Sequence, residues 1–173
     1  MSALGGMFDV HPAFLPVDMS GGANTGDWFN ASRYHSVGIM LTKALGTAGQ
    51  DPTITVSQAT DNAGTGSKAL NLPTKASSFV WKKQAATDLT ATAAWANASA
   101  DVTNNTLTNG TLAEEAAIVF IEIPCDLLDA DGGFDYIQAS VADVGGAAQL
   151  GVVHYFGFEP RYQTRPDLVA SPL

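Results

Sequence analysis

Charged side chains are scarce in this sequence. Asp, Glu, Lys and Arg make up 14% of its 173 residues, against roughly 25% in ordinary soluble domains. Only eight residues are Lys or Arg, and the formal net charge is −9. Nucleic-acid binding needs clustered basic side chains that displace counterions from phosphates, and Lys82 and Lys83 form the only adjacent basic pair. We therefore expect no nucleic-acid partner, and the acidic charge equally disfavours binding to an anionic membrane.

The shortage of charge also bears on association. A weakly charged surface has little electrostatic protection against contact with other proteins. In this sequence Ala, Thr, Ser, Asn and Gly take the place of the missing charged residues. Such a surface is typical of a protein that functions in a stable assembly with other proteins.

Cysteine is nearly absent. Cys125 is the single thiol, so the chain cannot form an internal disulfide. A nucleophilic cysteine needs a basic neighbour that lowers its pKa, whereas the nearby charged residues, Glu122 and Asp126, are both acidic. We expect Cys125 to be a half-buried structural thiol. A chain of 173 residues suits one domain and can bury a sufficient core without disulfides.

Long hydrophobic runs and secretory features are missing too. Residues 1–7 lack the basic region and apolar core of a signal peptide. No stretch approaches the roughly 20 apolar residues needed to span a membrane. We expect a protein made in the cytoplasm, with no membrane partner.

Motifs that carry catalysis are lacking as well. His11, His35 and His154 show no zinc-ligand spacing. The glycine-rich stretch 62–68 fails the phosphate-loop pattern, because its lysine does not follow glycine. No Gly-x-Ser-x-Gly motif occurs. The sequence predicts that the protein is not an enzyme, with no catalytic residue and no cofactor.

One acidic stretch, residues 126–135, is a weak candidate for a metal site. Asp129, Asp131 and Asp135 alternate with glycines, and closely spaced carboxylates can wrap Ca²⁺. The EF-hand pattern is not met, because Gly133 stands at its fifth position and no Glu at its twelfth. The alternative is a turn in which Asp side chains accept hydrogen bonds from backbone amides.

Short β-strand patterns dominate the middle of the chain, separated by Gly, Asn, Asp and Pro. Residues 53–57 alternate strictly between Thr or Ser and aliphatic side chains. Residues 118–123 are apolar except for Glu122, which predicts a strand buried on both faces. The other expected strands are 36–42, 78–82, 136–141 and 150–156. Helix signals are thin: one turn is expected at 111–114, and 85–100 favours irregular strands and loops.

These patterns predict a mainly β fold, an antiparallel β-sandwich or jelly roll over residues 28–160. Residues 1–27, with several Gly and Pro, and residues 161–173, with Pro166 and Pro172, are expected to form extended N- and C-terminal arms, although 14–17 could make an edge strand. The candidate residues for a partner interface are Phe14, Trp28, Arg161 and Tyr162.

Two parts of the sequence, which together cover about half the chain, resemble small virion proteins of tailed bacteriophages, the head decoration or cement proteins. One runs from Thr25-Gly-Asp-Trp-Phe-Asn30 to Gly66-Ser-Lys-Ala-Leu70, and the other from Leu128-Asp-Ala-Asp-Gly-Gly-Phe-Asp-Tyr136 to Pro160-Arg-Tyr162. The resemblance implies a non-enzymatic protein on the exterior of the phage head, made in the host cytoplasm. Its partner would be the major capsid protein, and a trimer would match the local threefold axes.

Two other functions remain open from the sequence. One is a jelly-roll module of a phage tail that binds carbohydrate or a receptor. The other is a tail-tube or connector protein.

Overall fold

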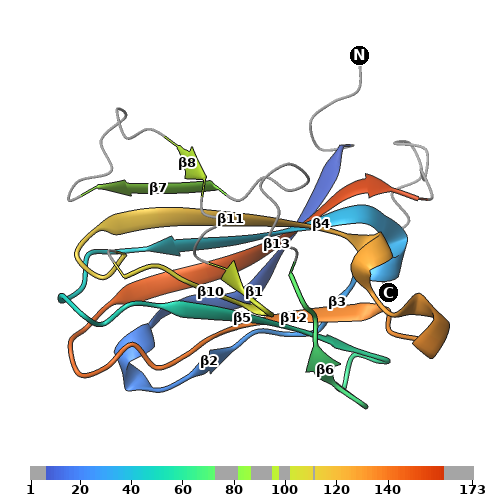
Figure 1. The fold of residues 1–173 in the computed structure, drawn as a ribbon, viewed down its shortest axis with the longest axis horizontal. Helices are drawn as coiled ribbons and strands as arrows, with labels where there is room; N and C mark the ends of the chain where they lie inside the picture. Colours follow the sequence, from blue (N-terminus) through green and yellow to red (C-terminus); the bar gives the residue numbers. More distant parts are fainter. Residues whose placement is uncertain (1–6, 73–81, 87–94, 98–101, 111, 162–173) are drawn as a thin grey trace.

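The computed structural model describes residues 7–72, 82–86, 95–97, 102–110 and 112–161 of the 173-residue chain. Within these ranges the protein is an antiparallel sandwich of two β-sheets (Figure 1). The prediction of a mainly β fold is confirmed.

The first sheet has six strands in the order β1-β13-β4-β11-β7-β8. Every neighbouring pair in it is antiparallel. Their bounds are β1 Phe8–Asp18, β13 Leu150–Pro160, β4 Tyr34–Lys43, β11 Ala116–Pro124, β7 Lys82–Ala86 and β8 Ala96–Asn97.

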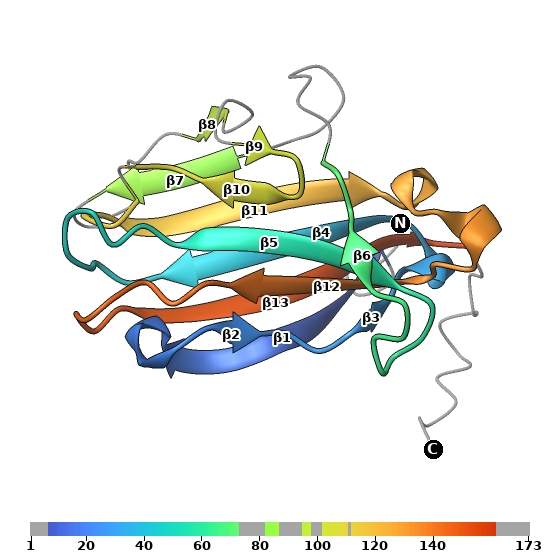
Figure 2. The ribbon, with the colours of Figure 1, turned by 60° about the horizontal axis from the view of Figure 1, so that its bottom comes forward.

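The second sheet, which faces the viewer in Figure 2, has the order β2-β12-β5-β10-β9. Two further short strands join it, because β3 pairs with β12 and β6 pairs with β5. Their bounds are β2 Asn24–Thr25, β12 Tyr136–Val141, β5 Thr53–Ala59, β10 Thr106–Thr108, β9 Val102–Thr103, β3 Phe29–Asn30 and β6 Lys68–Ala69.

The connectivity is that of a jelly roll. From β1 the chain crosses to β2 and β3, back to β4, and over to β5, which pairs with β10. It then returns through β11, β12 and β13, alternating between the sheets. Four strands of each sheet, in the orders β1-β13-β4-β11 and β2-β12-β5-β10, have the arrangement that two Greek keys produce in a jelly roll.

Short 3₁₀ helices punctuate the connections, at Met19–Gly21, Ala31–Arg33, Cys125–Leu127 and Ala130–Gly132. None of the helical segments in the described part of the chain is long and apolar enough to cross a lipid bilayer.

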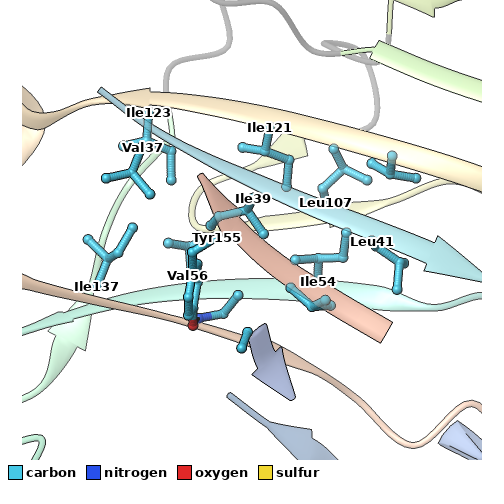
Figure 3. Close-up of a cluster of buried hydrophobic side chains, with 14 of the residues drawn as sticks. Val37, Ile39, Leu41, Ile54, Val56, Leu107, Ile121, Ile123, Ile137 and Tyr155 are labelled. Carbon is cyan, nitrogen blue, oxygen red and sulfur yellow. Dashed lines mark hydrogen bonds between the residues drawn. The ribbon is translucent and has the colours of Figure 1, made fainter. Parts of the chain in front are cut away.

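The core lies between the two sheets and follows from strand alternation. In β4, Val37, Ile39 and Leu41 are fully buried, and in β5 Ile54 and Val56 face them. Figure 3 shows these side chains meeting others from β10, β11, β12 and β13. Each buried aliphatic side chain contributes about 1.5–3 kcal/mol of hydrophobic free energy, so this layer holds the sheets together.

Tyr155 ties distant parts of the chain through the core. Its side chain is 1% exposed. The hydroxyl donates to the carbonyl oxygen of Asp27 at 2.9 Å and accepts from the backbone N–H of Ala139 at 2.8 Å. The buried hydroxyl therefore has a partner both as donor and as acceptor. These two hydrogen bonds link the Asp27 backbone to β12 of the second sheet.

The expected N-terminal arm, residues 1–27, is wrong over its described part. β1 pairs with β13 along most of its eleven residues, Ala13 and Met19 are buried in the core, and β2 belongs to the second sheet. The two prolines that suggested an arm, Pro12 and Pro16, fit because β1 is an edge strand, where one row of N–H groups needs no partner. The expected edge strand at 14–17 was thus the middle of a longer one.

The prediction for residues 118–123 was wrong on one point. β11 exists, but its side chains alternate between buried and partly exposed, so only one face lies in the core. The expected strand at 78–82 falls mostly outside the described residues, as do most of 85–100 and Thr111. Residues 162–173 of the expected C-terminal tail also lie outside them.

Candidate binding face

The outer face of the second sheet is polar, as is usual for an antiparallel sheet with one face in the core and the other in water. Its partly exposed positions carry hydroxyl and amide side chains, with one tyrosine. We call this surface the polar face, and its residues are Thr53, Thr55, Ser57, Thr106, Thr108, Tyr136, Gln138 and Ser140.

The outer face of the six-stranded sheet has a different composition. Across β1, β13, β4 and β11 the register brings outward positions into rows that are mostly apolar, with one polar side chain in each row. Glu122 is the one carboxylate among them. We call this surface the apolar face, and its residues are Phe8, Val10, Pro12, Ser36, Gly38, Met40, Thr42, Ile118, Phe120, Glu122, Pro124, Val152, His154, Phe156 and Phe158.

Four phenylalanines form the centre of the apolar face. The rings of Phe156 and Phe158 stack at 6.1 Å between centroids and 11° between planes. Phe8 lies 5.9 Å and 6.0 Å from these two rings, and Phe120 lies 6.0 Å and 6.2 Å from them. The aromatic side chains of three strands thus form one continuous cluster on the outside of the sandwich.

Gly38 makes room for this cluster. A Cβ atom at this position would lie 2.5 Å from Cζ of Phe120 and 2.9 Å from Cε2 of Phe158. A larger residue would therefore push the rings apart. Because Gly38 has no side chain, the aromatic rings from β11 and β13, on either side of β4, can meet above it.

Polar groups mark the limits of the apolar face. Ser36 donates from Oγ to Oε1 of Glu122 at 3.1 Å, and the exposed Glu159 follows Phe158 with a left-handed φ of 49°. Nδ1 of His154 is buried and has no hydrogen-bond partner within the described part of the chain.

The size of the apolar face suits the centre of a protein interface. Three strand spacings of about 4.8 Å and six residues of about 3.3 Å give roughly 300 Å². The outward side chains of β4, β11 and β13 over this area of sheet are partly exposed, and apolar patches of a few hundred Å² on soluble proteins are often functional. A stable interface buries about 800 Å² per partner, with an apolar centre and a polar rim.

Three of the four interface residues expected from sequence lie in the described part, and they do not form one site. Phe14 is only partly exposed and packs against the core. Arg161 is exposed, but its Nε donates to the Tyr34 carbonyl at 3.0 Å and its backbone N–H to that of Arg33 at 2.8 Å. Tyr162 lies outside the described residues.

Trp28, the other expected interface residue, lies between β2 and β3. It lines an open cavity of about 240 Å³ together with His11, Pro12, Asp27, Phe29 and Tyr155. Trp28 was predicted to be an interface residue. The structure shows that it is partly exposed and that it lines this cavity.

The acidic stretch forms a turn. Asp129 accepts from the Gly132 amide at 3.1 Å and pairs with Lys68, whose Nζ also lies 3.9 Å from the centroid of Phe134. These contacts, the hydrogen bond from Lys68 foremost, lower the pKa of Asp129. Asp131 and Asp135 are exposed, and the described residues contain no group of three His, Cys, Asp or Glu that could hold a metal.

Cys125 is buried, with 6% of its surface exposed. Burial raises the pKa of its thiol to about 11. The thiol is therefore protonated at neutral pH and a poor nucleophile.

The phenylalanine cluster was missed by sequence reasoning, although a signal for it exists. Residues 118–123 and 150–156 are apolar at odd and even positions alike, which was interpreted for the first segment as burial on both faces. A strand in a two-layer sandwich has only one face in the core. The second apolar face must therefore meet something else.

No protein-family model matches the sequence, and no curated protein sequence matches it. Among solved structures, the crystal structure of the SPBc2 prophage-derived protein YomS is similar. The two chains share 9% identity with a TM-score of 0.39, and the match covers 86% of this chain and 92% of YomS. A likeness at that TM-score carries no argument about function.

Proposed function

We propose that this chain is a non-enzymatic structural protein of a tailed-phage particle, which binds and stabilises the head as a cement or decoration protein. Its partner would be the major capsid protein, and its place the exterior of the head. The apolar face is the observation that supports this proposal, because it is the surface of this sandwich least suited to water.

The partner surface is defined by the chemistry of the apolar face. Four clustered phenylalanines call for an apolar patch that excludes water around them, since buried aromatic side chains dominate interface energy. Glu122 and Glu159 border these rings. We therefore propose a capsid surface with an apolar centre and basic side chains at its edge. A trimer at a local threefold axis would place three such faces on neighbouring capsomers.

The test uses capsids of the phage that encodes the chain, prepared from a mutant phage that lacks the gene. Purified protein is added, and bound protein is measured after sedimentation. Wild-type protein should saturate the capsids. The double variant Phe156→Thr/Phe158→Thr should bind at least about tenfold more weakly, because it removes two central anchors.

The matched control is Thr55→Ala/Ser140→Ala, which changes two neighbouring positions of the polar face. It should bind like wild type, and circular dichroism should show that both variants are folded. Equal binding of the phenylalanine variant and wild type would exclude the apolar face. No binding of wild-type protein would exclude the cement function, and glycan arrays and negative-stain microscopy would then test the receptor-binding and tail-tube alternatives.

A further inference from the structure

The cavity beside Trp28 has the chemistry of a cation receptor. The residues that line it include the exposed Asp27, which carries a carboxylate, and three aromatic residues, of which Trp28 is partly exposed and Phe29 and Tyr155 are buried. Aromatic rings attract cations through their quadrupole, most strongly tryptophan. We propose that this cavity binds a guanidinium or ammonium group flanked by apolar carbon, such as the end of an arginine or lysine side chain of a partner protein. The proposal is independent of the cement function.

The cavity walls are held in place by contacts within the fold. The backbone N–H of Gly26 donates to the Ala139 carbonyl at 2.9 Å, and that of Asp27 donates to the Ala13 carbonyl at 2.9 Å. The Tyr155 hydroxyl donates to the carbonyl of Asp27. The segment that carries the carboxylate and the indole is thus fixed to both sheets, so little ordering is needed when a ligand binds.

The rings are fixed in the same way. Phe29 stacks on Tyr155 at 5.2 Å and on Tyr34 at 5.4 Å, and the ring of His11 lies 5.3 Å from it. One edge of the Trp28 indole lies against Gly64, where a Cβ atom would be 2.6 Å from Nε1. These contacts place the aromatic walls before any ligand enters.

The protein already uses this combination of groups once. Lys68, in β6, contacts both the carboxylate of Asp129 and the ring of Phe134, which belong to the turn between β11 and β12. Asp27 and Trp28 offer the same pair of groups, but no Lys or Arg lies among the described residues that line their cavity. Its volume of about 240 Å³ is below the roughly 300–1,000 Å³ of drug-sized pockets, which suits one side-chain group.

The test is a titration followed by ¹H–¹⁵N NMR on the whole protein, with the indole N–H signal of Trp28 assigned through Trp28→Phe. The probe is Nα-acetyl-arginine N-methylamide, and its neutral isostere, Nα-acetyl-citrulline N-methylamide, is the matched control ligand. We expect a saturable shift with a millimolar-range Kd for the arginine probe. The citrulline probe should bind about fivefold more weakly or not at all.

Two variants complete the test. Asp27→Asn keeps the shape of the edge and should weaken arginine binding about fivefold. Asp131→Asn makes the same charge change at an exposed position outside the cavity and should have no effect. Equal shifts with the arginine and citrulline probes, or unchanged affinity in Asp27→Asn, would overturn the proposal. Choline provides a second arm: tighter binding of choline than of the arginine probe would support a cation receptor and assign it to a small quaternary amine.

Discussion

At the scale of single residues, Lys43 is the least ordinary side chain of the sandwich. It ends β4 with 3% of its surface exposed, and its Nζ donates to the backbone carbonyls of Leu112 and Glu115. Burial is the largest cause of its lowered pKa, which is about 8, although Asp51, Glu115 and Glu114 act in the opposite direction. The carbonyls satisfy the ammonium group but do not replace its full hydration.

The pH dependence of stability should reveal this lysine. Between pH 8 and about 10.4, the ordinary lysine pKa, the unfolded chain keeps the Lys43 proton while the folded protein loses it. The free energy of unfolding contributed by Lys43 therefore rises with pH in this window and is constant below it. Urea unfolding of wild type and Lys43→Met at pH 7.5, 9 and 10 measures the difference.

Other titrating groups cancel in that comparison. Cys125, with its pKa raised to about 11, lowers the stability of both proteins as pH rises above the ordinary thiol value. The difference between wild type and Lys43→Met should still grow in favour of wild type toward pH 10. Parallel pH profiles would show that Lys43 is protonated equally in the folded and unfolded states.

At the scale of elements, β1 decides where the domain begins. It forms the edge of the six-stranded sheet, with register shifts near its prolines. It leads into the fully buried Met19, whose Sδ lies 2.5 Å from where a Cβ of Gly151 would be. Because β1 pairs with β13 and contributes Ala13 to the core, it cannot be removed as an appendage.

Truncation should therefore unfold the protein. Deletion of residues 1–24 removes β1 and Met19, and we expect the cooperative thermal transition seen by circular dichroism to disappear. Met19→Ala should cost about 2–5 kcal/mol in urea unfolding. Leu15→Ala, in β1, changes a side chain that is 71% exposed and should change stability by less than about 0.5 kcal/mol. A truncated protein that folds stably would instead support the expectation that these residues form an N-terminal arm.

At the scale of the whole molecule, the two outer surfaces of the sandwich are unequal. Hydroxyl and amide groups cover most of the polar face, and aromatic rings form the centre of the apolar face. One side of the molecule is thus suited to water, and the other to a protein surface.

The inequality can be measured without any partner. Nile red is uncharged, so the acidic protein does not repel it, and its fluorescence should rise on binding native wild-type protein. Phe156→Thr/Phe158→Thr should remove most of that rise, whereas Thr55→Ala/Ser140→Ala should leave it unchanged. Identical fluorescence of the two variants would mean that the apolar face is not open to solvent.

The fold class and most of the strands can be predicted from local sequence patterns. The expected strand 136–141 coincides with β12, and 53–57 and 36–42 lie within β5 and β4. Local alternation and turn residues carry this information, because the two-residue period of a strand is written into neighbouring positions. The turn chemistry of Asp129 was likewise visible among the alternatives for its segment, since its contact with the Gly132 amide is local.

The contacts between residues far apart in the sequence could not be predicted from such patterns. Alternation shows that Phe156 and Phe158 share one face, but pairing across β13, β4 and β11 brought them to Phe120 and made that face the outer one. The Trp28 cavity joins residues 27 and 155, whose contact spans 128 positions. Such neighbours follow from which strands pair and which face finds the core, and these are long-range choices that no local pattern encodes.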